Sequence, residues 1–281
     1  MTRFQNVKTV FGDFRIGRII MLTLVPASVS FGLGGSWVLV LLSGLIGATL
    51  STSGFYLDSL LDYEEDRKSG KIHNPLARGA LSPRTGIIIV LICLSICIIV
   101  GILVNYWILL PILCVIFIIG GLSTRAIGTP LLRAIGLGAI QAFYVLVGAL
   151  VVYRFELGVI LISLFLFFAM TGARVLGDTR DLPYDQKIET NTIPKKYGVR
   201  WASLFLLVNE IMAYVVGIAV YWTGILNIVY LFCMIGIIIV GLPLTLFFIF
   251  WPTPRNANIA NMLSLGILGI LFILGMILGR L

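Results

Sequence analysis

The sequence predicts an all-α polytopic membrane protein that forms a single domain over residues 1–281. Hydrophobic residues make up 59% of the chain and charged residues only 11%, and the mean hydropathy is +1.09. Long apolar runs recur from one end of the chain to the other. This combination excludes a soluble globular domain and is typical of a chain that crosses the bilayer many times.

Nine apolar runs predict nine transmembrane helices, because each is close to the roughly 20 residues that cross a bilayer as a helix. The first 14 residues are mixed in character and predict a short amphipathic segment at the membrane interface. Ser82 followed by Pro83 is typical of an N-cap and first-turn proline. The predicted spans are 15–33, 37–62, 84–104, 107–122 (marginal in length), 131–152, 157–178, 201–221, 226–250 and 259–279.

The distribution of basic residues predicts the orientation in the membrane. Of the 20 Lys and Arg residues, only Arg154 and Arg280 fall on the side opposite the N-terminus. Loops rich in Lys and Arg stay in the cytoplasm. We therefore expect the N-terminus and the two long loops, at about 58–83 and 174–200, to face the cytoplasm from the cell (inner or plasma) membrane. The net charge of +8 then reflects topology and contact with anionic lipid, not a nucleic-acid partner.

Two sets of aspartates follow the second and sixth runs. Asp58, Asp62 and Asp66 are spaced four apart, so they share one face of a continuous helix over roughly 12 Å. Asp178, Asp181 and Asp185 share a face if the helix continues through Pro183, which can instead interrupt it. Stacked carboxylates near a membrane need neutralising cations or protons.

Six carboxylates without a histidine or cysteine set predict a site for a hard cation, chiefly Mg²⁺. His73 is the only histidine and is read as a surface residue, and the four cysteines lie inside apolar runs. Basic residues accompany the aspartates, and carboxylates, metal and Arg or Lys together describe a clamp for a diphosphate. The residues assigned to it are Arg67, Lys71, Arg78, Arg125 and Lys195.

These motifs resemble those of the UbiA superfamily of intramembrane prenyltransferases, which has nine transmembrane helices and two aspartate-rich motifs after helices two and six. Asn74–Gly79 and Thr192–Gly198 are similar to the family's segments that flank the two motifs. The departures from the family pattern are Asp58 for Asn, Ser59 for a frequent Asp, Asn74 for a common Arg and Leu122 for a frequent Tyr.

The resemblance implies a UbiA-type bundle with its active site at the cytoplasmic end of a central cavity. It also implies Mg²⁺-dependent transfer of a prenyl group from a polyprenyl diphosphate to a lipophilic acceptor, a quinone precursor or an isoprenoid glycerol phosphate, with release of pyrophosphate. Two Mg²⁺ ions would be held by the six aspartates. Asp62, Asp66, Asp181 and Asp185 are the ones we also assign to catalysis.

A cation-coupled transporter is the alternative, because transporters also use intramembrane carboxylates. Transporters place these groups near the membrane midplane, whereas the aspartates here lie at one end beside long loops. Glu210, in the middle of the seventh run, is the one midplane candidate. It is read either as a hydrogen-bonding residue between helices or as part of the substrate cavity.

Overall fold

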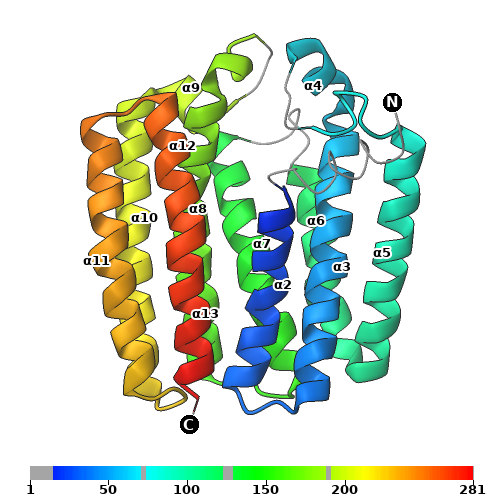
Figure 1. Cartoon of the computed structure of the whole chain (residues 1–281), viewed down its shortest axis with the longest axis vertical. Coiled ribbons are helices and arrows are strands. Elements are labelled where there is room, and N and C mark those ends of the chain that lie inside the picture. Colours follow the sequence, from blue (N-terminus) through cyan, green and yellow to red (C-terminus); the bar gives the residue numbers. More distant parts are fainter. Residues whose placement is uncertain (1–14, 71–73, 123–128, 188–190, 281) are drawn as a thin grey trace.

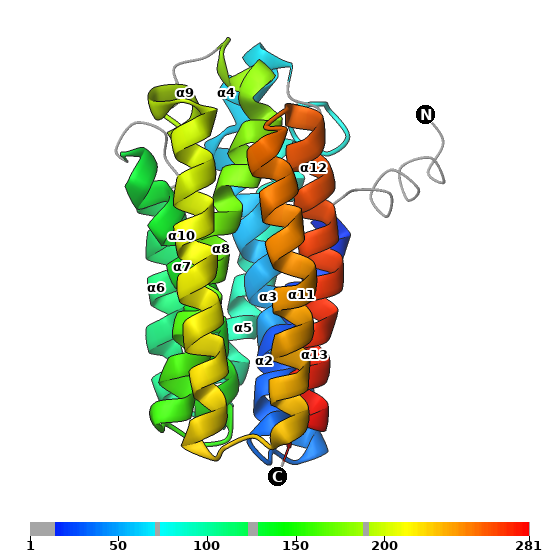
Figure 2. The ribbon, with the colours of Figure 1, turned by 90° about the vertical axis from the view of Figure 1, so that its left-hand side faces the viewer.

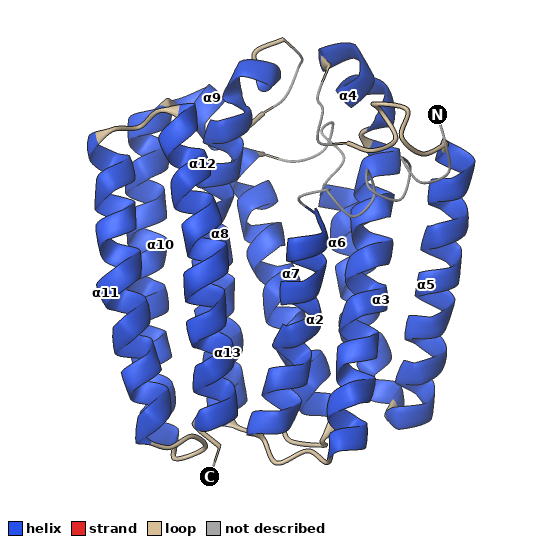
Figure 3. Ribbon diagram, in the orientation of Figure 1, coloured by secondary structure: helices blue, strands red, loops and turns tan. Residues whose placement is uncertain are grey.

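The computed structural model describes residues 15–70, 74–122, 129–187 and 191–280, and the regular elements within these ranges are helices (Figure 3). The predicted all-α class is confirmed. In these ranges seven helices are long and apolar enough to cross a membrane, and two shorter apolar helices, Gly17–Gly32 and Tyr106–Gly121, occupy the first and fourth predicted spans. Length and composition therefore support seven spans, and two of the nine predicted ones are shorter.

Most of the helices run the full height of one bundle, with two short helices at one end (Figure 1). The short helices are α4 (Tyr63–Ser69) and α9 (Ile193–Tyr197), and we call their end of the bundle the motif end. The long helices are α2 (Arg15–Gly32), α3 (Trp37–Leu61), α5 (Pro83–Val104), α6 (Leu109–Leu122), α7 (Pro130–Val151), α8 (Leu157–Asp185), α10 (Val199–Ala219) and α11 (Ile228–Phe250).

The last span is not one regular helix. It consists of α12 (Pro254–Leu263), a π-helical segment (Ser264–Leu268) and α13 (Gly269–Leu278). Short 3₁₀ turns, Tyr106–Ile108 and Val220–Thr223, precede α6 and follow α10. A π-helical turn inside an α-helix is rare in proteins, and those that occur often lie at functional sites.

Helices α2, α3, α6, α7, α8, α10, α11 and α13 pack in that order in a ring that α13 closes on α2, and α2 also packs directly on α7 across it (Figures 1 and 2). Helix α5 lies outside this ring against α3. Large apolar side chains such as Leu103, Phe117 and Trp222 are exposed on the outside, as expected of a surface that faces lipid.

Three local predictions have different outcomes. Ser82 caps α5, since its hydroxyl oxygen accepts a hydrogen bond from the Thr85 amide at 3.1 Å, which confirms the predicted start. Helix α8 continues through Pro183 to Asp185, so the proline does not interrupt it. The predicted unbroken helix through the first aspartate set is wrong, because α3 ends at Leu61 and α4 starts at Tyr63, with Asp62 at the junction. Residues 1–14, the predicted amphipathic segment, lie outside the described ranges.

Candidate active site

The ring encloses a cavity of about 380 Å³ that reaches from the motif end into the apolar interior. Its polar side chains come from both aspartate sets and from four arginines, while most of the remaining lining is aliphatic or aromatic. The apolar part includes Leu22, Phe165, Leu166, Ile237, Leu268 and Phe272. Such a cavity matches a molecule with a charged head and a hydrocarbon tail.

The three aspartates of the first set all line the cavity, although the helix breaks between them. The backbone hydrogen bonds Asp62 N–H to Asp58 O, at 3.0 Å, and Asp66 N–H to Asp62 O, at 2.9 Å, carry the four-residue spacing across the break. Asp66 is buried, with 4% of its surface exposed. The predicted common face is therefore retained, because the junction preserves the helical register.

Asn74 holds the first set in place from the loop that follows α4. Its amide donates hydrogen bonds of 3.0 Å to Asp66 Oδ2 and to the backbone carbonyl of Ser59. Its side-chain carbonyl accepts hydrogen bonds from the Leu76 and Ala77 amides. Asn74 is only 1% exposed, so one buried amide joins the end of α3, the Asp66 carboxylate and the loop.

The second set lies on the last turns of α8. Arg174 Nε is 2.9 Å from Asp178 Oδ1. Arg180 binds both oxygens of Asp181, at 2.7 and 2.9 Å. Both pairs line the cavity. These carboxylates are therefore partly neutralised by arginines that also face the enclosed space.

Asp185 is placed differently from the other five predicted ligands. It is 4% exposed but is not among the described residues that line the cavity. Its backbone carbonyl accepts a hydrogen bond of 2.8 Å from Lys195 Nζ of α9. The lysine thus ties α9 to the end of α8.

The basic residues predicted to bind diphosphate are not brought together at the cavity. Arg67 and Arg78 are exposed and do not line it, and Arg67 lies 3.4 Å from the Tyr63 hydroxyl. Lys195 is exposed and does not line the cavity either, and its Nζ donates to the end of α8. Lys71 and Arg125 lie outside the described residues.

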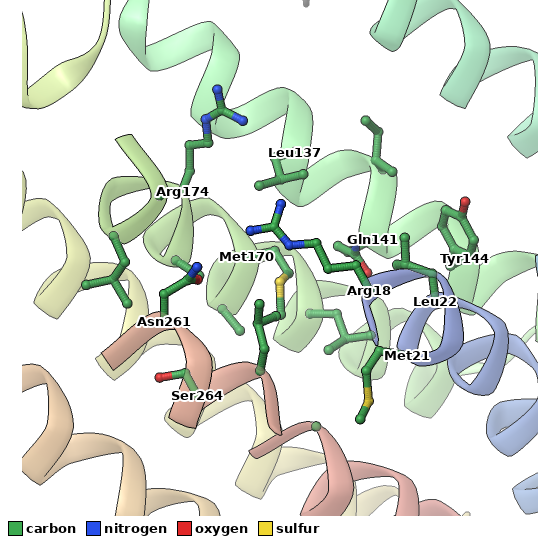
Figure 4. Close-up of a pocket in the computed structure, with 18 of the residues that line it drawn as sticks. Arg18, Met21, Leu22, Leu137, Gln141, Tyr144, Met170, Arg174, Asn261 and Ser264 are labelled. Atoms are coloured by element: carbon green, nitrogen blue, oxygen red, sulfur yellow. The ribbon is translucent and has the colours of Figure 1, made fainter. Parts of the chain in front are cut away.

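The cations that do line the cavity are Arg18 of α2, Arg133 of α7 and the two arginines of α8. Figure 4 shows Arg18 reaching from α2 toward the middle of the pocket, with Arg174, Gln141, Asn261 and Ser264 around it. Arg18, Arg133 and Arg174 are charged residues inside predicted apolar runs, where charge is expensive, and that is their signal in the sequence. Arg180 lies next to Asp181 in the sequence, beside the second aspartate set.

Five aspartates at the motif end of one cavity suit a hard cation, which prefers oxygen ligands. Among the described residues, however, no three carboxylate, histidine or cysteine side chains converge into a ready-made metal cage. Mg²⁺ usually takes one or two protein carboxylates and completes its octahedron with waters and substrate phosphate oxygens. The arrangement therefore fits Mg²⁺ bound together with a phosphorylated substrate.

Comparison with known sequences gives one family. A sequence model of the UbiA prenyltransferase family matches residues 19–276, which is nearly the whole described bundle. A search of curated protein sequences found no significant match.

Solved structures with the same fold cover almost the entire chain. A structure of digeranylgeranylglyceryl phosphate synthase has a TM-score of 0.71 at 18% identity and covers 98% of this chain and 99% of its own. A UbiA homologue from Aeropyrum pernix K1 has a TM-score of 0.76 at 18% identity, covering 94% and 98%. A homologue from Archaeoglobus fulgidus bound to GPP and Mg²⁺ has a TM-score of 0.71 at 19% identity, covering 95% and 98%.

Proposed function

The chain belongs to the UbiA prenyltransferase family and is therefore a membrane-bound prenyltransferase, and we propose that it transfers a prenyl group from a polyprenyl diphosphate to a lipophilic acceptor. The observation that carries the proposal is one cavity with aspartates and arginines at the motif end and an apolar interior below them. The Archaeoglobus fulgidus homologue bound to GPP and Mg²⁺ supports the donor and the metal.

The six aspartates of the two sets, Asp58, Asp62, Asp66, Asp178, Asp181 and Asp185, would together hold two Mg²⁺ ions, with no more than one or two carboxylates on each ion before the donor's diphosphate binds. When bound, Mg²⁺ would supply Lewis-acid stabilisation of the charge on the departing pyrophosphate. Asp185 stays among the proposed ligands although it does not line the described cavity.

The chain's own cations contribute to the same step. Arg174 and Arg180 lie beside the second aspartate set and face the cavity, so they are placed to neutralise diphosphate oxygens as the C–O bond breaks. Arg67, Lys71, Arg78, Arg125 and Lys195 remain proposed as contacts that form when the loops close over the donor. Loop closure would also exclude water from the allylic cation.

The acceptor is proposed to carry a polar head on a lipophilic body, as a quinone precursor or an isoprenoid glycerol phosphate does. Arg18 and Arg133 line the cavity from α2 and α7, which carry no motif aspartate. They offer a cationic environment to an anionic head. The structural similarity to digeranylgeranylglyceryl phosphate synthase is consistent with an acceptor of the glycerol phosphate type and leaves the quinone precursor open as well.

The transporter alternative has less support. The aspartates gather at one end of the bundle and not at its middle, where a transporter would place them. The last span contains a π-helical segment, Ser264–Leu268, but this segment carries no carboxylate. Purified protein in nanodiscs with radiolabelled prenyl diphosphates decides between the two. Mg²⁺-dependent pyrophosphate release that needs an acceptor supports the transferase, and ion flux in liposomes without release contradicts it.

We expect Asn74→Ala to raise the Mg²⁺ concentration for half-maximal activity about tenfold, the lower limit for loss of a residue that orients a metal ligand. The change removes the amide that holds Asp66 and the Ser59 carbonyl. A Mg²⁺ titration of prenyl transfer measures it. Asn258→Ala, on α12 and outside the cavity lining, is the matched control. Identical titrations for both variants would contradict a positioning role for Asn74.

The motif end is proposed to face the cytoplasm. We expect a cysteine introduced by Lys68→Cys to react with a membrane-impermeant maleimide only after the cells are permeabilised. A cysteine introduced by Phe155→Cys should react in intact cells, since Phe155 is exposed at the opposite end. The reverse labelling pattern would show that the basic loops lie outside.

A further inference from the structure

A second acidic site lies deep in the cavity, away from both aspartate sets. Glu210 is in the middle of α10, lines the cavity and is 8% exposed. The neighbouring Asn209 and Leu206 pack on Gly172 of α8, and Asp178 follows Gly172 by six residues. At 1.5 Å per residue, Glu210 therefore lies roughly 10 Å below Asp178 along the bundle.

The surroundings of Glu210 hold one of its two oxygens. Tyr214, one turn further along α10, donates a hydrogen bond of 3.2 Å to Oε2, and Thr245 of α11 donates to the same oxygen. Gly241 leaves room for the Tyr214 hydroxyl, because a Cβ there would overlap it. The hydrogen bonds that join α10 to α11 at this point therefore satisfy Oε2.

The other carboxylate oxygen is not accounted for by the helix packing. Within the described part of the chain, no hydrogen bond reaches Oε1 of Glu210, and the side chain faces the cavity. The apolar residues that line the same cavity include Phe165, Ala213, Ile237, Leu268 and Phe272. A carboxylate oxygen that opens onto such a cavity is satisfied only by a donor group of a molecule that enters it, water or ligand.

A prenyl diphosphate cannot supply that donor. Its diphosphate belongs at the aspartates, some 10 Å away along the bundle axis, and its tail is a hydrocarbon without an O–H or N–H group. A hydrocarbon tail packed against Oε1 would leave the carboxylate unsatisfied. In the proposed reaction, the molecule that can carry a hydroxyl into the cavity is the acceptor.

We propose that Glu210 is an acceptor-recognition residue whose Oε1 accepts a hydrogen bond from a hydroxyl group of the bound lipid or aromatic alcohol. Tyr214 and Thr245 are positioning residues, since they fix the carboxylate through Oε2 and leave Oε1 toward the ligand. The site selects acceptors that carry a free hydroxyl and disfavours ethers and hydrocarbons of the same shape. This inference rests on the proposed function in one respect, since it requires that an acceptor molecule enters the cavity.

The test compares two probes that differ in one donor group, geranylgeranylglycerol and its di-O-methyl ether. Binding to protein in nanodiscs is measured by calorimetry with Mg²⁺ and the unreactive analogue geranylgeranyl thiodiphosphate present. We expect the wild type to bind the alcohol about tenfold more tightly than the ether, as sites built for a hydroxyl do. Glu210→Leu, which removes the acceptor oxygen, should lose most of this preference while it still binds the donor analogue.

The controls separate recognition from folding. Asn209→Ala changes the adjacent buried residue, which bonds its own helix and does not line the cavity, and it should keep the full preference. If Glu210→Leu fails to fold, Tyr214→Phe and Thr245→Val each remove one hydrogen bond to Oε2 and should lower the preference two- to threefold, in the range of one weakened hydrogen bond.

Equal binding of alcohol and ether by the wild type would overturn the inference, as would a full preference in folded Glu210→Leu. The proposed function fails in a different experiment. If no pair of donor and acceptor gives prenyl transfer, the proposed reaction is wrong. The binding experiment does not depend on turnover, so it still shows whether the cavity prefers the alcohol to the ether.

Discussion

Replacing Asp62 or Asp181 by alanine is expected to lower kcat/KM for prenyl transfer at least about a hundredfold. Asp62 lies at the junction of α3 and α4 on the cavity wall. Asp181 lies opposite on α8, where it binds both nitrogens of the Arg180 fork. Each substitution removes a proposed Mg²⁺ ligand, and the second also leaves Arg180 without that partner beside the donor.

The measurement is Mg²⁺-dependent pyrophosphate release in nanodiscs, together with the thermal unfolding temperature of each variant. Neither aspartate is fully buried, so we expect both variants to fold. Glu64→Ala is the matched control, because Glu64 is an exposed acid of α4 that does not line the cavity, and it should stay within about twofold of wild-type activity. Near-normal turnover in either aspartate variant would refute the metal assignment.

The helices and the two aspartate sets were readable from the sequence because they depend on local pattern. Apolar runs of bilayer length mark the spans. Ser82-Pro83 marks the start of α5, because the capping hydrogen bond joins residues only three apart in the sequence. The continuation of α8 through Pro183 was not decided by the sequence. A proline near a helix end loses little, because the hydrogen bond it removes can be one of the last in the helix.

The cations of the site were harder to predict, since nearness in sequence is a poor guide to nearness across a bundle. Arg67 follows Asp66 directly and yet is exposed, while Arg18 and Arg133 face the cavity from helices far from either motif in sequence. Helices α2 and α7 precede α3 and α8 in the chain and pack on them, and the packing of α2 on α7 joins these two pairs around one cavity. Charges embedded in apolar runs were the one signal, and positive-inside topology explains them equally well.

Glu210 shows the same limit at a single residue. Its neighbour Tyr214 follows it by four residues, a spacing that places both on one helix face, so that contact was predictable. Thr245 lies 35 residues away on another helix, and the pairing of α10 with α11 is a tertiary result. Whether Glu210 ties helices or lines the cavity could not be chosen from sequence, and in the structure it does both.

Substituting Gly138 is expected to have the largest effect on stability. Ala134, Gly138 and Ala142 are small residues spaced four apart on α7, a pattern that allows close helix packing. A Cβ at Gly138 would overlap the Thr171 hydroxyl and the Phe167 carbonyl of α8. Because the carbonyl belongs to the backbone, the helices must separate. We expect Gly138→Ala to cost about 1–3 kcal/mol, the range for overpacking a well-packed core, and Gly138→Val to prevent folding.

Thermal unfolding in detergent measures the effect, and Gly120→Ala is the matched control. Gly120 is a helical glycine of α6 with no atom near its missing Cβ, so alanine there should leave the unfolding temperature unchanged or raise it slightly. Equal unfolding temperatures for the two variants would show that α7 and α8 yield without cost. If Gly138→Ala instead pushes the two helices apart, the folded variant should also lose specific activity. Arg133 and Gln141 of α7 line the same cavity as the Arg174–Asp178 pair of α8, so a shift of α7 displaces them from that pair.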